Sequence, residues 1–213
     1  FTGLNHQEIA IKLIEMGKGE DVAVNLDKFT GLNHQEIANK LIEMVNRAKA
    51  ERLNKFTGFD QEITMRLIQT YENNYLADNL YKFTGLNQEI ANKLIEMGKG
   101  ETVAENLNSF TGLNHQEVAI KLIEAGQGED VATNLDKFTG LNHQEIANKI
   151  IERGKGETVV RYLNKFTNVN HQEIAEKLIE VGKGETVAYY LDKFTGLNHQ
   201  EVVTQLIEAG QGA

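Results

Sequence analysis

The sequence lacks cysteine, proline and tryptophan entirely, and it contains no long apolar run. Without cysteine, the chain can form neither a disulfide framework nor a thiolate metal site. No apolar stretch approaches the roughly 18 residues of a membrane-spanning helix, and no N-terminal signal pattern is present. We therefore expect no membrane partner. The composition leaves the compartment open, with a reducing or intracellular one as a suitable setting.

Catalytic motifs are also missing from the sequence. It contains no nucleophile–base constellation, no phosphate-binding loop and no dinucleotide fingerprint. The stretch GKGE at 17–20 is too short for a phosphate-binding loop, and it follows a predicted helix rather than a strand. We therefore expect neither an enzymatic activity nor a cofactor.

Basic residues are outnumbered by acidic ones. Lysine and arginine total 22 against 31 aspartates and glutamates, which gives a formal net charge of −9. An acidic surface favours solubility and repels phosphate backbones unless the basic residues gather on one face. A hydrophobic content of 40% is typical of a folded, soluble chain.

What the sequence does contain is one phrase, FTGLN or a close relative, repeated at intervals of 27 or 28 residues. Such a fixed period indicates a stack of structural repeats. The chain starts and stops within a repeat, as expected for a segment of a longer array. We expect a single array over 1–213, with repeats at 4–31, 32–58, 59–85, 86–112, 113–140, 141–168, 169–196 and, in part, 197–213.

The first half of each repeat has the pattern of an amphipathic helix. In repeat one, Asn5 is a suitable N-cap, and Glu8 follows three residues later in a capping-box arrangement. Gly17 supplies the left-handed residue that ends many helices. The pattern predicts a helix over about 6–16. Its apolar stripe consists of Ile9, Ala10, Leu13 and Ile14.

The second half predicts another helix, beginning after Gly19 and ending at Gly31. Val22, Leu26 and Phe29 recur at helical spacing, and Lys28 lies in the last turn, where a cation is favourable. Helices of roughly 10–11 residues are too short to be stable alone in water. We therefore predict an all-α fold, an α-solenoid of about 7.5 tandem αα-hairpin repeats forming a right-handed superhelix.

Repeats two to four depart from the common pattern. Repeats three and four omit the histidine, and the glycine turn is missing from repeats two and three. We expect longer or differently bent helices over 44–81. A hinge, a specialised binding patch and simple sequence drift are all interpretations of this region.

Residues that differ between repeats are expected to form rows on the surface. One row lies in the first helix and includes Asn39, Asn92 and Asn148. A second row, in the second helix, becomes aromatic towards the C-terminus at Arg161, Tyr162, Tyr189 and Tyr190. Tyrosine and arginine are favoured at interfaces, so these seven residues are candidate contacts with a partner. Drift of exposed positions and packing against the next repeat are the alternatives.

The six histidines all occupy the same place in the phrase NHQE. We expect them at the first helical position, facing solvent. Copies in adjacent repeats should lie about 9–10 Å apart, the spacing of packed helices, which is too far to share one zinc ion. No metal site is expected. The six are His6, His34, His115, His143, His171 and His199.

The turn between the two helices carries a further pattern, in which a variable residue precedes glycine, then lysine or glutamine, then glycine. This layout resembles the repeats of transcription-activator-like effectors, in which the residue before the glycines meets a DNA base and the turn touches phosphate. The resemblance implies that base contacts fall on Met16, Met97, Ala125, Arg153, Val181 and Ala209. It implies phosphate contacts at Lys18, Lys99, Gln127, Lys155, Lys183 and Gln211. The repeats here are shorter than those of that family and lack its proline.

Taken from the residues, the function expected first is a non-catalytic scaffold that presents an extended repeat surface to a protein or peptide. The alternative is a DNA-binding repeat array with its inter-helix turns on the phosphate backbone. End-to-end self-association is a third expectation, because neither end of the sequence shows a polar capping repeat.

Overall fold

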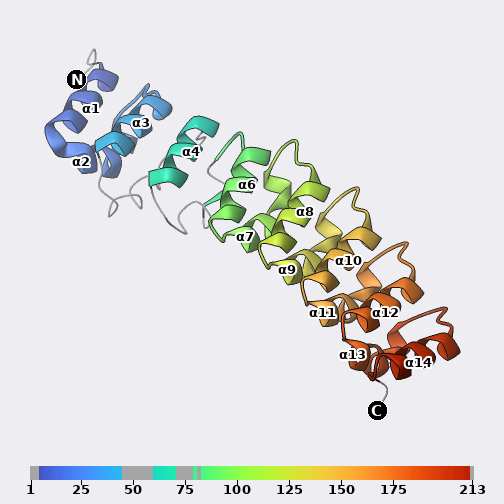
Figure 1. Ribbon diagram of the computed structural model, residues 1–213. Helices are drawn as coiled ribbons and strands as arrows, with labels where there is room; N and C mark the ends of the chain where they lie inside the picture. Colours follow the sequence, from blue (N-terminus) through green and yellow to red (C-terminus); the bar gives the residue numbers. More distant parts are fainter. Residues whose placement is uncertain (1–4, 45–59, 71–78, 81–82, 212–213) are drawn as a thin grey trace. The chain divides into compact units, whose positions relative to one another are not determined.

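The protein is described by a computed structural model, which places residues 5–44, 60–70, 79–80 and 83–211 (Figure 1). Within these residues the chain is helical, contains no strand, and repeats a helix–turn–helix spacing. The all-α prediction is confirmed. The residues cluster into two compact units, an N-terminal unit (Phe1–Lys99 with Ser109–Gly112) and a C-terminal unit (Gly100–Asn108 with Leu113–Ala213). The expectation of a single array over 1–213 stays a prediction.

The N-terminal unit contains the first repeats of the chain. Repeat one is described almost completely, whereas much of repeats two and three lies outside the described residues. The elements of this unit are α1 (His6–Leu13), η1 (Ile14–Lys18), α2 (Gly19–Val24), η2 (Leu26–Lys28), α3 (His34–Met44), α4 (Gln61–Thr70) and α6 (Gln88–Glu96). Of the irregular stretch 44–81, α4 is the described helix; the expected longer or bent helices there fall on residues outside the described ones.

The C-terminal unit has the most regular repeats. Its first helices contact one another in succession, and so do its second helices. The first helices are α8 (His115–Glu124), α10 (His143–Glu152), α12 (His171–Glu180) and α14 (His199–Glu208). The second are α7 (Gly100–Glu105), α9 (Gly128–Thr133), α11 (Gly156–Arg161) and α13 (Gly184–Tyr189), and a short 3₁₀ turn follows each: η5 (Leu107–Ser109), η6 (Leu135–Lys137), η7 (Leu163–Lys165) and η8 (Leu191–Lys193).

The first helix begins and ends where its sequence predicts. In repeat six, the Asn142 side chain accepts a hydrogen bond from the backbone N–H of Glu145 (3.2 Å), as an N-cap should. The helix ends at Glu152, and Gly154 follows with φ 77°, a conformation that glycine adopts without steric cost. Repeat one differs slightly, since α1 ends at Leu13 and its last turn continues as η1.

The capping-box prediction is wrong in one respect. The backbone N–H of the capping asparagine is bonded by a glutamine of the preceding repeat, not by the glutamate of its own helix. Asn142 N–H donates to Gln116 Oε1 (2.9 Å), and Gln116 Nε2 donates to Glu145 Oε2 (3.0 Å). The same asparagine–glutamine bond joins Asn33 to Gln7, Asn170 to Gln144 and Asn198 to Gln172. The cap therefore depends on the neighbouring repeat.

The second helix is shorter than predicted. Its α-helical part has six residues, after which a 3₁₀ turn of three residues brings the chain to a buried phenylalanine. In a 3₁₀ turn, residues i and i+3 lie on the same side, so Leu135 and Phe138 both enter the core. Gly140 (φ 69°) follows in the extended connection. The glycine at this position, Gly31 in repeat one, therefore does not end the helix, as the sequence had suggested.

The core consists of the predicted apolar stripes, and the same positions are buried in each regular repeat. Removing such side chains from water is the main source of stability, at about 25 cal/mol per Å² of apolar surface. In repeat six these residues are Ile146, Ala147, Ile150, Ile151, Val159, Val160, Leu163 and Phe166.

Candidate functional site

The variable row of the first helices lies at the edge of solvent rather than fully on the surface. Asn39, Asn92 and Asn148 are half-buried. Each side-chain oxygen accepts one hydrogen bond: Asn39 from Arg66 (2.8 Å), Asn92 from Gln88 (3.0 Å) and Asn148 from Gln144 (3.3 Å). A partner that reaches these residues would contact side chains that are already held in place.

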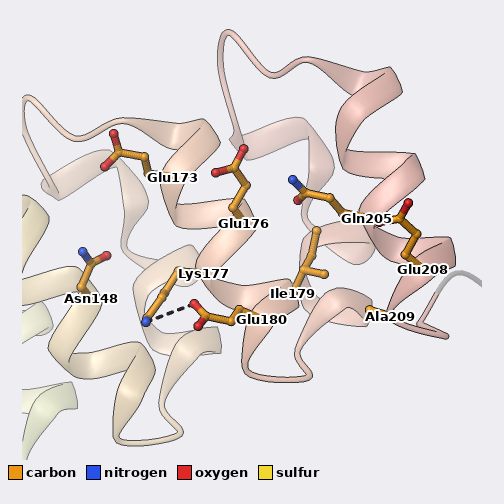
Figure 2. A pocket seen from close by; sticks show the side chains of 9 residues that line it. All are labelled: Asn148, Glu173, Glu176, Lys177, Ile179, Glu180, Gln205, Glu208 and Ala209. Atoms are coloured by element: carbon orange, nitrogen blue, oxygen red, sulfur yellow. Dashed lines mark ion pairs between the residues drawn. The ribbon is translucent and has the colours of Figure 1, made fainter.

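A groove of about 540 Å³ opens beside this row in the C-terminal unit (Figure 2). Its walls come from α12 and α14, and Asn148 of α10 lies at one end. Of the three asparagines predicted as partner contacts, Asn148 therefore lines a groove. Glu176 takes the same place as Asn148 in the next repeat, and it also faces this groove.

The groove is acidic. Four carboxylates line it, those of Glu173, Glu176, Glu180 and Glu208, and Lys177 is the basic residue among the lining side chains. Lys177 forms ion pairs with Glu180 (3.1 Å) and with Glu152 (3.4 Å) outside the lining, and hydrogen bonds to these carboxylates raise its pKa. Three lining carboxylates therefore remain without Lys177 as a counter-ion. The groove has the electrostatic character of a site for cationic groups.

Two substitutions account for this local charge. One repeat earlier, the residue equivalent to Glu176 is Asn148, and the residue equivalent to Gln205 is Lys177. The positions equivalent to the groove lining therefore hold three carboxylates and two lysines in that repeat. The change from Asn to Glu adds one negative charge, and the change from Lys to Gln removes one positive charge. The acidic groove is therefore a property of the last two repeats and not of the repeat pattern.

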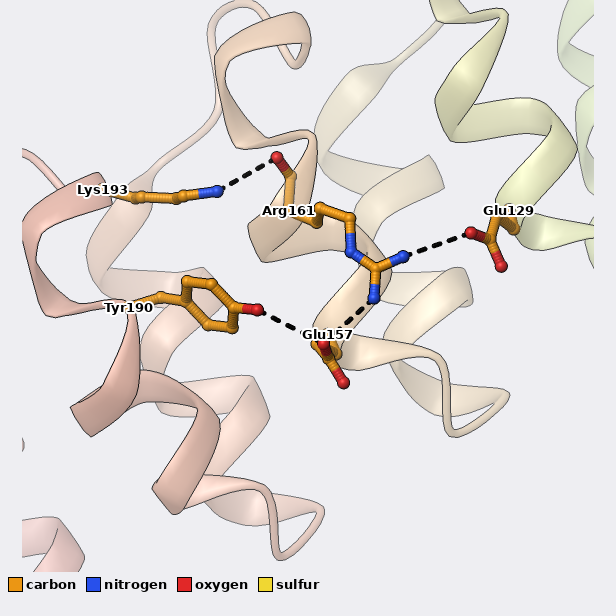
Figure 3. Close-up of polar contacts among 5 residues, drawn as sticks. All are labelled: Glu129, Glu157, Arg161, Tyr190 and Lys193. Atoms are coloured by element: carbon orange, nitrogen blue, oxygen red, sulfur yellow. Dashed lines mark hydrogen bonds and ion pairs between the residues drawn. The ribbon is translucent and has the colours of Figure 1, made fainter.

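The arginine and tyrosine residues predicted as partner contacts form a polar network across three repeats (Figure 3). Arg161 of α11 forms ion pairs with Glu129 of α9 (3.3 Å) and with Glu157 of its own helix (3.0 Å). The Tyr190 hydroxyl donates to the same Glu157 (3.3 Å), and Lys193 Nζ donates to the backbone oxygen of Arg161 (3.2 Å). The hydrogen bond from Arg161 lowers the pKa of Glu157.

The three tyrosines differ in how far they face solvent. Tyr162 and Tyr190 are half-buried, and each lies under a lysine, with Lys165 Nζ 5.8 Å and Lys193 Nζ 4.9 Å from the ring centroids. Tyr189 is 79% exposed and meets the Tyr190 ring nearly edge-on, with centroids 4.7 Å apart. Of the four predicted contacts, Tyr189 presents most of its side chain to solvent.

Apolar surface surrounds Tyr189. A second groove of about 520 Å³ is lined by Tyr189 together with Val203 and Ile207 of α14. Val203 and Ile207 are 53% and 66% exposed, whereas the corresponding Ala147 and Ile151 are fully buried by the neighbouring repeat. The expected end-to-end self-association would use this surface. It stays a prediction, which light scattering over a range of protein concentrations tests.

The turn residues separate into two groups by chemistry. Lys18, Lys155 and Lys183 are exposed, whereas Lys99, Gln127 and Gln211 are half-buried. The Gln211 amide faces the preceding repeat, where its oxygen accepts from Gly184 N–H (2.5 Å) and its nitrogen donates to the Ile179 oxygen (3.0 Å). Lysine has no acceptor atom and cannot make the first of these bonds.

Gln127 is placed in the same way as Gln211. A Cβ atom built on Gly100 would lie 1.8 Å from Gln127 Oε1, so the amide packs directly against the start of the preceding second helix. Both glutamines therefore point into the protein and depart from the expected phosphate-contact role. The Gln211 amide bonds the preceding repeat, whereas the buried Gln127 Oε1 has no hydrogen-bond partner in the described part of the chain.

The variable residues before the turn glycines are mostly on the surface. Met16 is 70% exposed and Val181 is 38% exposed. Ala125, Arg153 and Ala209 are also exposed, and Met97 is half-buried. The structure brings Ala209 to the edge of the acidic groove, beside Glu208 (Figure 2).

The prediction that the histidines face solvent is wrong for four of the six. His6, His115, His143 and His171 are half-buried, and the ring of each bonds the connection at the end of its own repeat. His34 and His199 are exposed. In the described part of the chain, no group of three or more histidine, aspartate or glutamate side chains lies close enough to hold a metal ion.

Sequence reasoning missed the two polar junctions, the glutamine–asparagine bond and the histidine bond, and it missed the acidic groove. A signal for the junctions was present, since glutamine and histidine recur as regularly as the apolar stripe. A signal for the groove was also present, because Glu176 and Gln205 both differ from the residues at the same positions one repeat earlier. Their combined effect becomes clear only when the two residues are known to lie close together.

Comparison of the chain with protein-family models, curated proteins and solved structures returned no match. Among the described helices, none combines the length and the apolar character that crossing a membrane requires. Function must therefore be argued from the geometry of the repeats.

Proposed function

We propose that the chain is a non-catalytic binding scaffold, which presents the exposed face of its first helices to a protein or peptide partner. The observation that carries this proposal is the groove between α12 and α14, where residues that vary between repeats, Glu176 and Gln205 among them, lie beside glutamates that the repeats share. Rows of variable side chains on a constant scaffold are the usual way in which repeat proteins build binding surfaces.

The partner that suits this groove is a basic segment. Its lysine or arginine side chains would meet Glu173, Glu176 and Glu208, where charge-assisted hydrogen bonds are stronger than neutral ones. The open groove admits an extended peptide, and Tyr189 supplies an exposed aromatic contact on the neighbouring second helix.

We further infer that the hairpins continue as an α-solenoid with the right-handed superhelix expected from the sequence. Support comes from the C-terminal unit, in which first helices pack on first helices and second helices on second helices. Small-angle X-ray scattering tests this inference: an elongated particle with a regular pitch is expected, and a compact globular profile would contradict it.

The binding proposal is tested by fluorescence anisotropy with a labelled lysine- and arginine-rich peptide. A glutamate-rich peptide of equal length is the negative control. Glu176→Gln is expected to weaken binding of the basic peptide by about two- to fivefold at low salt, because it removes the carboxylate that would pair with a cationic side chain of the peptide. Gln205→Lys, which restores the residue of the earlier repeat, is expected to weaken it similarly.

Glu105→Gln is the matched control, because it makes the same charge change on α7, away from the groove. Equal weakening by Glu105→Gln would show that only the net charge matters. Equal affinity for the basic and the glutamate-rich peptide would contradict the proposal.

The nucleic-acid alternative rests on the exposed Lys18, Lys155 and Lys183. It is tested with labelled random duplex DNA and single-stranded RNA at about 50 mM and 200 mM salt, since phosphate contacts weaken steeply with salt. Tight, salt-sensitive binding that is lost in Lys155→Gln and Lys183→Gln would favour this alternative over the peptide scaffold.

A further inference from the structure

A histidine at the start of the first helix bonds the connection at the end of its own repeat, and it does so in the same way in four described repeats. Its Nδ1 atom accepts a hydrogen bond from the backbone N–H of the threonine that follows the next phenylalanine. These bonds are His6–Thr30 (2.8 Å), His115–Thr139 (2.7 Å), His143–Thr167 (2.7 Å) and His171–Thr195 (2.8 Å). The ring also meets that phenylalanine edge-on, with centroids 6.0–6.1 Å apart. We call this arrangement the histidine clamp.

The histidine clamp requires an uncharged ring. A nitrogen that accepts a hydrogen bond carries no proton, so the clamp selects the tautomer with its hydrogen on Nε2. Protonation would place an Nδ1–H against the threonine N–H, so the bond to the backbone would be lost. The hydroxyl of the same threonine, whose Oγ1 lies 3.1–3.2 Å from Nδ1, is then the acceptor within reach of the ring. Acid therefore leaves the threonine N–H without its acceptor at each clamp.

The charged groups near the histidine ring differ from one clamp to the next. Around His143, the neighbouring elements carry Asp136 in η6, Glu145 on its own helix, Lys165 in η7 and Glu173 on α12. Asp136 forms an ion pair with Lys165 (3.4 Å), so each offsets the charge of the other.

The surroundings of His171 are described by a cavity of about 500 Å³ beside the ring. The neutral Asn164 of η7 takes the place of Asp136 there, and Lys193 of η8 is the charged residue that lines the cavity. Its own helix carries Glu173, and Glu201 lies in the first turn of α14.

Repeats three and four lack the histidine, and the described residues show what replaces the clamp in repeat four. Repeat four reads LNQE and omits the residue. Thr111, which follows the phenylalanine here, donates its backbone N–H to the backbone oxygen of Leu86 (2.8 Å). Its hydroxyl bonds the same oxygen (3.2 Å). A carbonyl oxygen does not titrate, so this junction provides an internal reference that is insensitive to pH.

We propose that the histidine clamps make the C-terminal unit an acid-responsive device, in which the connections that lead from one repeat to the next loosen when the clamp histidines are protonated. Each clamp holds the segment that precedes the next first helix, so opening three clamps in one unit weakens it at several places together. This property is independent of the binding function proposed above.

The ionisation of His143 agrees in direction with this geometry. Burial lowers the pKa of His143 below its ordinary value of 6.5. The folded state therefore binds this proton less readily than the unfolded state. The stabilisation is present above about pH 6.5 and is lost as the pH falls below that value.

The test is amide hydrogen exchange of the isotopically labelled whole chain at about pH 7.5 and about pH 5, on either side of the ordinary histidine pKa. Rates are divided by the intrinsic rate at each pH. Protection of Thr139, Thr167 and Thr195 is expected to fall at the lower pH. At Thr167 the fall is at most about tenfold for each pH unit between the ordinary histidine pKa and the lowered pKa of His143. Protection of Thr111 is expected to stay constant.

A variant with His115, His143 and His171 each replaced by asparagine provides the control. The asparagine side-chain oxygen takes the position of Nδ1 but does not titrate. The threonine amides of the variant are therefore expected to keep their protection at both pH values. Unchanged protection of the wild-type threonines at low pH, or an equal loss in the asparagine variant, would overturn the proposal. If the triple variant does not fold, His143→Asn with Thr167 as its readout makes the same comparison.

Discussion

Asp130 lies in the first turn of α9, at the position where α7, α11 and α13 carry threonine. Partial burial raises its pKa, and the negative charges of Glu101, Glu129 and Glu105 add to this effect. A raised pKa means that the folded chain binds this proton more readily than the unfolded chain. Stability therefore falls as the pH rises through the folded pKa, and the loss persists at neutral pH.

Asp130→Thr, which introduces the residue found in α7, α11 and α13, is expected to raise the urea midpoint of unfolding at neutral pH. The gain should disappear below the ordinary pKa of 3.8, where the wild-type carboxyl is protonated in both states. Urea titrations followed by circular dichroism at several pH values measure this difference. A lower midpoint at neutral pH would show instead that attraction to the positive end of the helix outweighs burial.

Among the elements, the second helices show how a six-residue helix is kept in place. A lysine in the next 3₁₀ turn donates to the last backbone oxygen of the helix before it, where the helix carries partial negative charge. Lys137 bonds Glu105 in this way (3.0 Å), Lys193 bonds Arg161 (3.2 Å), and Lys165 bonds Thr133. The helix end is thus satisfied by the neighbouring repeat rather than by its own chain.

Lys137→Ser is expected to destabilise the chain by about 0.5–1.5 kcal/mol, the net value of one such hydrogen bond. Serine is the natural residue at this position in repeat four, Ser109, so the change is tolerated by the fold. Urea unfolding measures the loss, and Lys155→Ser on the exposed turn is the control. An equal effect of both variants would attribute it to charge alone.

The first helices were predictable from sequence because each of their signals is local. The asparagine cap and the turn glycine lie on the helix that they delimit, and α8 begins and ends as this pattern predicts. The length of the second helix was not predictable in the same way. The spacing of Val22, Leu26 and Phe29 suits a continuous helix as well as a short helix followed by a 3₁₀ turn.

The candidate site shows the same limit of local reasoning. The tyrosine and arginine row is predicted to contact a partner, with packing against the next repeat as the alternative. Tyr190 bonds Glu157, which lies 33 residues away in the preceding repeat. Contacts of this kind join residues that share no helix, and a pattern within one repeat cannot reveal them. The acidic groove depends on α12 and α14 together for the same reason.

At the scale of the whole molecule, the chain divides into two compact units, and the C-terminal unit contains its own caps, clamps and core. A repeat that contacts only its neighbours needs no distant part of the chain to fold. The unit should therefore be an independent folding unit.

A fragment of residues 100–213 is expected to fold alone, with a helical circular dichroism spectrum and a cooperative urea transition. A fragment of one repeat, 113–140, is the control and is expected to be unfolded, because short isolated helices are unstable in water. An unfolded longer fragment would show that the C-terminal unit depends on the preceding repeats.

The junctions between repeats carry one more consequence, for the way in which such a chain can change in length. Each regular repeat makes the same two bonds, from its glutamine to the asparagine N–H of the next repeat and from its histidine to the threonine N–H at its own end. A second copy of 141–168 placed after residue 168 would find matching partners on both sides. Duplication or deletion of whole repeats by recombination between near-identical stretches would leave no backbone donor unpaired. The gain or loss of a single residue is a different event, because the bonds around it must change partners. In repeat four, which lacks the histidine, the Thr111 N–H donates to the Leu86 backbone oxygen instead.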